Sequence, residues 1–239
     1  MLAFHEVEDA ARFRARMEWL RAEYDVVRLA DLPARRPALR TVVALTFDDG
    51  YGSWHEVAAP ILRALGLPAT FFVCSGLVGL AGGAAEEFRR RCLGRTRPLR
   101  PLSRQELADL ATDPLFEIGS HTRHHVDLGV ARDPGLLADE IDGDRHRLED
   151  WTGRPVLRFA YPFGGPRNVS PAAVERVAAA GFRAAFTFVP GFYDEDDAFR
   201  LRRDGLDDHD STALWRAWLG GGYDRPYALK ERIRREAMP

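Results

Sequence analysis

The residues Val42–Phe47 constrain the fold of this chain more than any other stretch. They form an apolar run rich in β-branched side chains, which ends abruptly in Asp48, Asp49 and Gly50. Such a run is typical of a strand buried on both faces, as in a parallel sheet. Gly50 predicts a turn, because glycine adopts positive φ at little cost. Two acids at the carboxyl end of a buried strand lie where α/β folds place their chemistry, although a turn with a helix N-cap explains the pair alone equally well.

Strand and helix patterns alternate along the rest of the chain. The expected strands lie at 1–7, 26–29, 42–47, 68–74, 116–119, 156–160, 184–189 and 199–203. The expected helices lie at 9–23, 57–65, 103–110, 133–151, 170–181 and 211–219. The segment 75–101 is rich in glycine and arginine and is expected to be an irregular loop. Strands alternating with helices predict an α/β fold with a parallel sheet, and their number favours a distorted (β/α) barrel of about seven strands.

The length of 239 residues and the lack of a linker-like stretch indicate one domain over 1–239. Within it, residues 1–40 are expected to supply a strand, a helix and a second strand. The residues after Gly220, at 221–239, are expected to form a polar tail. Neither a GxGxxG pattern nor a P-loop spacing occurs, which argues against a nucleotide-binding sheet.

Composition and charge exclude several classes of partner. The formal net charge is −2, and the arginines are scattered among acids, so we expect no nucleic acid or anionic membrane as a partner. No apolar segment is long enough to span a bilayer, and the chain does not open like a secretory signal. We therefore expect a cytoplasmic protein as the sequence is written, or a secreted or envelope protein if the true start lies upstream. Cys74 and Cys92 lack CxxC spacing and are expected to be reduced thiols, with a single disulfide as the alternative.

A second polar motif follows the strand expected at 116–119. His121 and His125 lie four residues apart, and together with a carboxylate they would suit zinc, or less exclusively cobalt, nickel or iron. Three protein ligands leave coordination positions open for water and substrate, which is typical of a catalytic metal. A metal there would lower the pKa of its water to about 7 and polarise a carbonyl, while the second aspartate could act as general base. Histidine pairs also occur in surface loops, but the acids at one strand end and Tyr161–Gly164 at another favour a site.

These motifs resemble the metal-dependent polysaccharide deacetylases of the carbohydrate esterase family 4 type, which share the NodB-homology domain. Thr46–Gly50 resembles the first motif of that family, and His121–His125 resembles the second. Phe159–Gly164 resembles the third motif, in the Phe-x-Tyr-Pro-x-Gly form of one branch. The resemblance covers nearly the whole chain and includes the supporting stretches 66–72 and 117–120. It implies a NodB-type barrel with the active site at the carboxyl ends of the strands.

The resemblance also implies roles for individual residues. Asp48 would be the catalytic base, and Asp49, His121 and His125 would bind one divalent metal, with Zn²⁺ expected and Co²⁺ or Ni²⁺ as alternatives. The backbone N–H of Phe163, in the place of a family tyrosine, would contact the oxyanion of the tetrahedral intermediate. The implied reaction is hydrolysis of an N-acetyl group, or occasionally an O-acetyl group, from an amino sugar in a glycan, with release of acetate.

The chain departs from the family pattern at two points. Many members carry an arginine where this chain has Ala160, and Arg203 or, with less support, Arg158 could replace it. Many members also use a late histidine to protonate the leaving amine. His209 is the candidate here, although the acidic run around it is more simply explained as a solvated turn ahead of the helix at 211–219. His124 lies between the two ligands and is not expected to be one.

Tyr51, Tyr161 and Pro162 are candidates for contacting the sugar ring, because they follow or lie within the active-site motifs. His5 ends the first expected strand and could line the cleft, but it has no partner at ligand spacing. Two alternative functions stay open: a related hydrolase of another amide or ester, and a glycan-binding relative without activity. The intact set of acids and histidines argues against the second, because binding alone does not require four converging polar groups.

Overall fold

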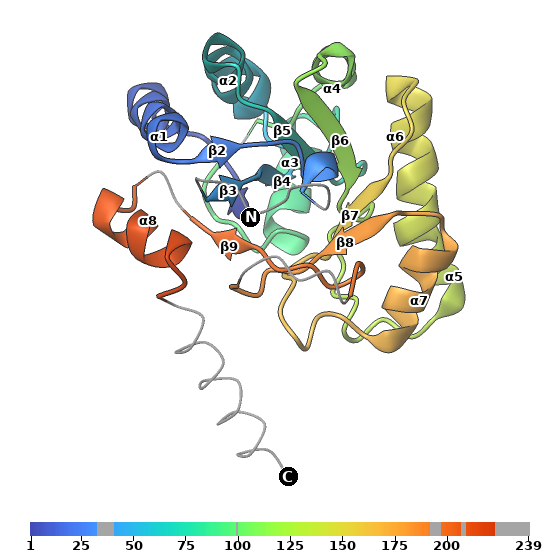
Figure 1. Cartoon of the computed structure of the whole chain (residues 1–239). Helices are drawn as coiled ribbons and strands as arrows, with labels where there is room; N and C mark the ends of the chain where they lie inside the picture. The colour runs from blue at the N-terminus through green and yellow to red at the C-terminus, as the bar shows by residue number, and fades with distance from the viewer. Residues whose placement is uncertain (33–40, 99, 192–196, 207–208, 223–239) are drawn as a thin grey trace.

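The computed structural model describes residues 1–32, 41–98, 100–191, 197–206 and 209–222. Seven parallel strands form a curled, open barrel with helices around its outside (Figure 1). The strand order is β8-β7-β6-β5-β4-β1-β9, so β8 and β9 form the two edges. The bounds are β1 Leu2–Phe4, β4 Leu45–Asp49, β5 Ala69–Val73, β6 Phe116–Ser120, β7 Arg158–Ala160, β8 Ala184–Phe186 and β9 Asp204–Gly205. This architecture confirms the predicted distorted barrel of parallel strands.

The helices are distributed along the chain between the strands. Their bounds are α1 Ala10–Glu23, α2 Ala59–Leu65, α3 Gly82–Arg91, α4 Arg104–Thr112, α5 Pro134–Ala138, α6 Asp144–Thr152, α7 Pro171–Ala179 and α8 Thr212–Leu219. A π-helical turn, Trp54–Ala58, leads into α2, and a second, Asp139–Gly143, joins α5 to α6. A 3₁₀ turn spans Leu29–Asp31. Ser103 and Glu106 form the expected capping box at the start of α4.

Alternation along β4 separates two apolar layers. Leu45 and Phe47 belong to the large core between the sheet and the helices. Ala44 belongs to a small cluster with Phe72 and Phe186 of neighbouring strands. Successive side chains of a strand point to opposite faces, so this smaller cluster fills the inside of the barrel. The even-numbered residues of β4 therefore face the barrel interior, and Asp48 and Asp49 lie at the carboxyl end of this strand.

Several predicted elements differ from the structure. The strand expected at 42–47 is divided into Val42–Val43 and β4, which belong to different sheets. The expected loop 75–101 contains α3, because its two glycines stand at the start of the helix, while Ala85 and Phe88 three residues apart bury one face. The strand expected at 26–29 shortens to β2, Asp25–Val26, which pairs with β3, Val42–Val43, in a separate sheet. The strand expected at 199–203 makes one isolated bridge at Leu201, and pairing with β1 begins only at β9.

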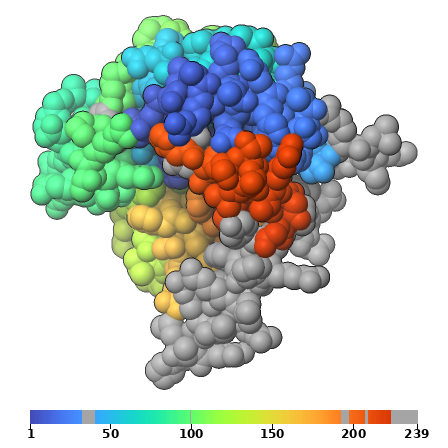
Figure 2. Space-filling model, turned by 90° about the vertical axis from the view of Figure 1, so that its left-hand side faces the viewer, coloured from blue at the N-terminus to red at the C-terminus, as the bar shows by residue number. Residues whose placement is uncertain are grey.

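Helix α8 packs beside α1 and β1, and Figure 2 shows it next to the N-terminal part of the chain. Trp215 is fully buried and contacts the rings of Phe4 and Trp19, with centroids 5.6 and 6.1 Å away. Arg16 lies over the Trp215 ring at 5.5 Å. Most of the tail predicted at 221–239 lies outside the described residues, and the single-domain assignment stays a prediction.

Of the helices in the described ranges, none combines the length and the apolar character that crossing a membrane requires. Cys74 is buried and Cys92 is partly buried, and both are free thiols.

Candidate active site

A cavity of about 370 Å³ opens at the carboxyl ends of the central strands. Asp48 and Asp49 end β4, His121 follows β6, and Tyr161 follows β7. Parallel strands bring their carboxyl ends to one edge, so residues far apart in the sequence meet there. The predicted site residues that line this cavity are Asp48, Asp49, His121, His125, Tyr161 and Phe163. Arg95 and Phe188 also line it and were not predicted, and His5, which the sequence offered only as a residue that could line the cleft, lines it as well.

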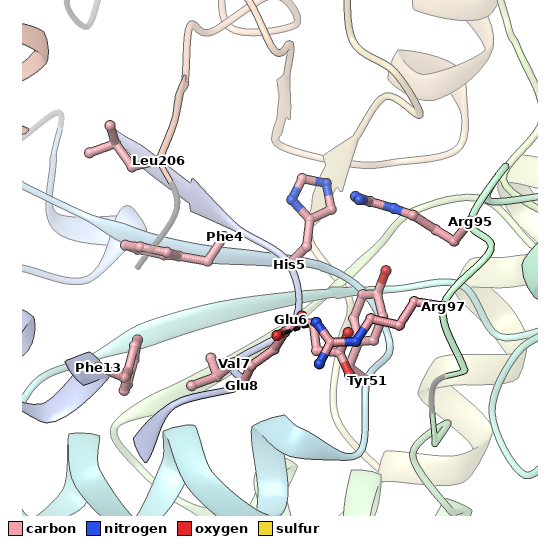
Figure 3. Close-up of a pocket in the computed structure, with 10 residues that line it drawn as sticks. All are labelled: Phe4, His5, Glu6, Val7, Glu8, Phe13, Tyr51, Arg95, Arg97 and Leu206. Atoms are coloured by element: carbon pink, nitrogen blue, oxygen red, sulfur yellow. Dashed lines mark ion pairs between the residues drawn. The ribbon is translucent and has the colours of Figure 1, made fainter. Parts of the chain in front are cut away.

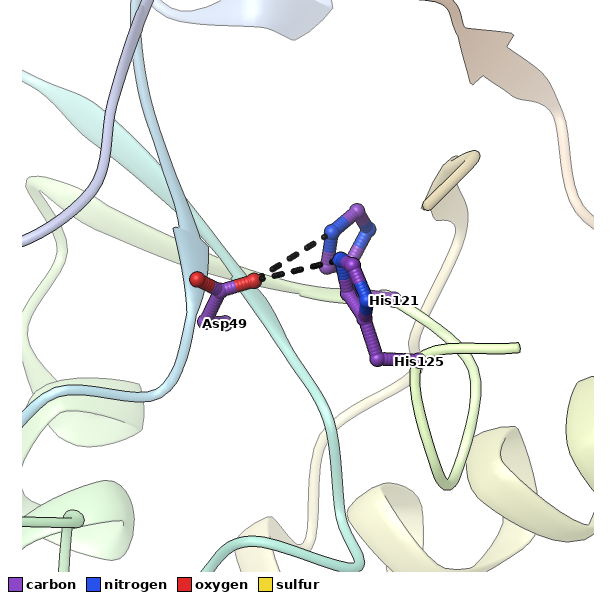
Figure 4. A group of neighbouring side chains, drawn as sticks. All are labelled: Asp49, His121 and His125. Carbon is purple, nitrogen blue, oxygen red and sulfur yellow. Dashed lines mark ion pairs between the residues drawn. The ribbon is translucent and has the colours of Figure 1, made fainter. Parts of the chain in front are cut away.

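Asp49, His121 and His125 form a compact group of three ligand atoms (Figure 4). Oδ1 of Asp49 lies 3.6 Å from Nε2 of His121 and 3.6 Å from Nε2 of His125. The Nδ1 atoms point away, to the carbonyls of Ala160 at 2.7 Å and Cys92 at 3.1 Å. A carbonyl can only accept, so each Nδ1 carries a hydrogen, and each Nε2 is the ring atom that faces the carboxylate.

The residues of this group fit a divalent metal. Oδ1 of Asp49 is buried and has no hydrogen-bond partner among the described residues, while Oδ2 accepts from the Tyr51 hydroxyl at 2.9 Å. Burial lowers the pKa of His121 to about 4, so its ring is neutral at pH 7. Two atoms that lie about 2.1 Å from one zinc ion at the tetrahedral angle are about 3.4 Å apart. The observed spacing of 3.6 Å is close to this value. The donor set of one carboxylate and two imidazoles suits zinc and its neighbours.

Backbone strain is concentrated at this site. Among the described residues other than glycine, positive φ occurs only at Asp49 (92°), Thr122 (62°), His125 (54°) and Phe163 (60°). Such conformations cost free energy and persist only where the surrounding structure imposes them. At Asp49 the consequence is direct: neighbouring side chains of a regular strand face opposite ways. Because Asp49 departs from strand geometry, its carboxylate and that of Asp48 line the same cavity.

Asp48 is held by Arg203, which is completely buried in the barrel interior. Nη1 and Nη2 of Arg203 donate to the two carboxylate oxygens at 2.6 and 2.8 Å. Nη1 also donates to Thr46 Oγ1 and Nε to the Thr187 carbonyl, both at 3.1 Å. The guanidinium stacks over the Phe72 ring at 5.1 Å. Burial by itself raises the pKa of Asp48, but the charge and hydrogen bonds of Arg203 outweigh it and lower the pKa below 3.8.

Arg203 therefore contacts the predicted base Asp48, whereas Arg158, the other candidate to replace the family arginine, does not line the cavity. Arg158 starts β7 and pairs with Glu117 at 3.3 Å, whereas the cavity lies beyond the other end of that strand. His209 also lies outside the cavity. Its Nδ1 is 2.6 Å from Nη1 of Arg12, and its side chain is 53% exposed.

His5, in contrast to His209, lines the cavity. It directly follows β1, and because Phe4 pairs with Phe47, His5 comes level with Asp48 on the neighbouring strand. It lines the cavity together with the predicted base. The available sequence signal was the same as for the acids: a polar residue at the end of an apolar strand.

The remaining predicted residues take different positions. The ring of Phe163 is half exposed and stands edge-on to His125 with centroids 4.6 Å apart. In the described part of the chain, the N–H of Phe163 meets no acceptor. Tyr161 lines the cavity, and its hydroxyl donates to the Phe199 carbonyl at 3.1 Å. Pro162 is buried and does not line the cavity, and Tyr51 is occupied with Asp49.

A second cavity of about 150 Å³ adjoins the first, and His5 and Arg95 belong to the walls of both (Figure 3). Its other polar side chains include Glu6 and Arg97, and Arg97 forms an ion pair with Glu8. Arg95 and Arg97 follow α3 in the segment that the sequence pattern had assigned to an irregular loop. The sequence carries no motif that would have marked them as part of a site.

Residues 35–185, more than half of the chain, match the sequence profile of the family described as polysaccharide deacetylase. The chain belongs to the polysaccharide deacetylase family. The predicted family resemblance is therefore confirmed, while its assignment to one motif branch stays a prediction.

Individual relatives agree with this membership. The poly-β-1,6-N-acetyl-D-glucosamine N-deacetylase of Escherichia coli K12 is 29% identical, over 80% of this chain and 34% of the relative. The chain thus spans about a third of the length of that curated relative. IcaB from Ammonifex degensii has the same fold, with a TM-score of 0.72, 24% identity and coverage of 91% of this chain and 95% of the other. A polysaccharide deacetylase from Bacillus cereus also has a TM-score of 0.72, with 21% identity and coverage of 91% and 67%.

Proposed function

We propose that this chain is a metal-dependent glycan N-deacetylase that hydrolyses the N-acetyl group of an amino sugar and releases acetate. One observation carries the proposal: an Asp49 oxygen without a hydrogen-bond partner among the described residues faces the Nε2 atoms of two imidazoles, beside a second carboxylate held by Arg203. Family membership supports deacetylation as the reaction. The name of the Escherichia coli relative supports a polymer of β-1,6-linked N-acetylglucosamine as the first substrate to test.

Asp49, His121 and His125 would hold the metal, for which we expect Zn²⁺, with Co²⁺ or Ni²⁺ as alternatives. A metal in this position would lower the pKa of water and polarise the acetyl carbonyl. Asp48 does not belong to the ligand group and lines the same cavity. It is therefore available to take the proton of the attacking water as general base. Arg203 holds Asp48 ionised and fixes its orientation.

The other cavity residues supply the remaining functions of an amide hydrolysis. The N–H of Phe163 is free to donate to the oxyanion that forms on the acetyl oxygen. The amine must receive a proton before the C–N bond breaks, and we assign this role to His5 because it lines the cavity. The rings of Phe163, Phe188 and Tyr161 line the cavity and offer apolar surface to a sugar ring. The adjoining cavity behind His5 would receive a neighbouring sugar of the polymer.

The metal centre is tested by measuring the metal content of the purified chain by mass spectrometry. We expect about one zinc or similar transition metal per chain in the wild type. The Asp49→Ala and His125→Ala variants should lose it, because each removes one of three protein ligands. His209→Ala is the matched control, since His209 lies outside the cavity, and it should keep the metal. A wild type that binds no metal after incubation with zinc, cobalt or nickel would contradict the proposed function.

The role of His5 is tested with two substrates that differ in leaving group. His5→Asn should lower kcat on an N-acetylglucosamine oligosaccharide by roughly 10²–10⁴-fold, the usual contribution of a general acid. An aryl acetate releases a phenolate that needs no proton, so the same variant should lose far less activity on it. His209→Asn should match the wild type on both substrates. Equal losses on amide and ester in His5→Asn would argue for a structural role instead.

A further inference from the structure

Glu140 is a buried carboxylate that does not line the catalytic cavity. It lies in the π-helical turn Asp139–Gly143, which joins α5 to α6, and it is 2% exposed. Figure 1 shows α5 and α6 outside the barrel. Its side chain contacts the loop between the two histidine ligands. Oε2 accepts the backbone N–H of His124 at 2.8 Å, and Oε1 lies 2.6 Å from Nδ1 of the same residue. The backbone carbonyl of Glu140 accepts the N–H of Arg123 at 3.1 Å.

The loop that Glu140 holds has a strained backbone. Thr122 and His125 both adopt positive φ, which is unusual for residues other than glycine and most unusual for a β-branched one. From the opposite direction, Gly76 donates its N–H to the Arg123 carbonyl at 2.9 Å. A Cβ at Gly76 would lie only 2.4 Å from that oxygen, so the loop is packed tightly against glycine backbone. This conformation directs Nε2 of His125 toward Asp49.

We propose that Glu140 is a positioning residue for the metal centre, holding the loop 122–125 in the conformation that presents His125 to the ion. This inference rests on the proposed metal site and concerns a residue that touches neither metal nor substrate. Outer hydrogen-bond partners of this kind fix the orientation of a ligand and thereby raise metal affinity. The energy gained from three hydrogen bonds offsets the strain of the loop.

A second carboxylate on the same helical segment acts in the same way on the other histidine. Asp144 begins α6 and is fully buried. Its Oδ1 accepts the N–H of Ser75 at 2.8 Å, and its Oδ2 accepts the hydroxyl of Ser120 at 2.6 Å. Ser120 directly precedes His121, so this contact holds the end of β6. Two buried acids four residues apart thus hold the segments that carry both histidine ligands.

The rival explanation is a second metal site. Ligand atoms of His124, Asp139 and Glu140 also lie within 4.8 Å of one another. These atoms are already engaged, since both oxygens of Glu140 contact His124 and both oxygens of Asp139 accept from Arg123 Nη1, at 2.7 and 2.8 Å. The satisfied hydrogen bonds favour positioning over coordination.

Crossed substitutions at Glu140 separate these explanations. Glu140→Gln removes the charge but keeps the length, and an amide can accept from the His124 N–H and donate to its ring nitrogen. Glu140→Asp keeps the charge but withdraws the carboxylate by one methylene. Asp139→Asn is the matched control, because it removes a neighbouring charge from an exposed ion pair. Each metal-free chain is titrated with Co²⁺, followed by visible absorption and displacement by Zn²⁺, and its fold is checked by circular dichroism and thermal unfolding.

We expect one Co²⁺ per wild-type chain. The apparent Kd should rise roughly 10–100-fold in Glu140→Asp, the usual effect of losing such a partner. It should stay within about fivefold in Glu140→Gln, because both hydrogen bonds persist. Asp139→Asn should match the wild type. Three results would overturn this inference and leave the proposed function standing. The first is a folded Glu140→Asp chain with the Co²⁺ affinity of the wild type. The others are a higher apparent Kd in Glu140→Gln than in Glu140→Asp, or a second bound ion that Glu140→Gln loses. A wild type that binds no metal would overturn the proposed function, and this inference with it.

Discussion

A chain carrying Asp48→Asn is expected to release acetate roughly 10²–10⁴-fold more slowly than the wild type while still binding one metal. The amide cannot take a proton from water, so the variant loses general-base catalysis. Metal binding should persist because Asp48 contributes no atom to the ligand group, and both of its oxygens accept from Arg203. Acetate release from the β-1,6-linked polymer and metal content are measured on the same preparation.

Asp49→Asn is the informative partner of this variant. It changes the adjacent residue by the same chemistry, yet it should lower both metal content and turnover, because Asp49 would supply a ligand oxygen to the proposed metal. Thermal unfolding of both variants shows whether the fold survives at the assay temperature. If Asp48→Asn kept turnover within tenfold of the wild type, another group would have to act as the base.

Arg203→Ala should lower the free energy of unfolding by about 3–5 kcal/mol at pH 7, because it leaves the buried carboxylate of Asp48 without its partner. Chemical denaturation at several pH values measures this loss. Turnover should fall as well, because the base loses both its orientation and its charge partner. Unchanged turnover would show that Arg203 does not take over the role of the arginine that many family members carry at the position of Ala160.

The pH dependence of this variant has a defined sign. In the wild type the pKa of Asp48 lies below 3.8, so the pair stabilises the fold above that pH, and the contribution disappears as the pH falls through the lower folded value. Without Arg203, its charge and hydrogen bonds no longer oppose the effect of burial, so the pKa of Asp48 should rise. The stability difference between the two chains should therefore shrink on acidification. The acidic limb of kcat/KM should move to higher pH in the variant, while Arg203→Lys should lie between the two.

Part of the candidate site could be predicted because it is encoded locally. Asp48 and Asp49 follow an apolar run, and His121 follows another, so strand ends are visible from residue pattern alone. Parallel pairing then requires these ends to share one edge, which predicts proximity without any coordinates. The alternation of the two patterns likewise predicted a barrel of parallel strands, and this was confirmed.

Other elements could not be predicted because competing local signals were misleading. The glycines at the start of α3 suggested a loop, although the helix depends on the burial of Ala85 and Phe88. The general acid was equally hard to predict from the sequence. His209 follows the third motif, as the late histidine of many family members does, but His5 is the residue that lines the cavity. Which histidine reaches the cavity depends on the pairing of β1 with β4.

The sequence by itself thus determined the family and the parallel barrel, which are confirmed, and it named Asp48, Asp49, His121 and His125 as the candidate site residues. The tertiary structure alone decided how those residues are held. Arg203 meets Asp48 across 155 positions of sequence, and the carbonyls of Ala160 and Cys92 orient the two imidazoles. The physical reason is that motifs record short-range periodicity, whereas buried charges and backbone acceptors find partners only after the strands are in register.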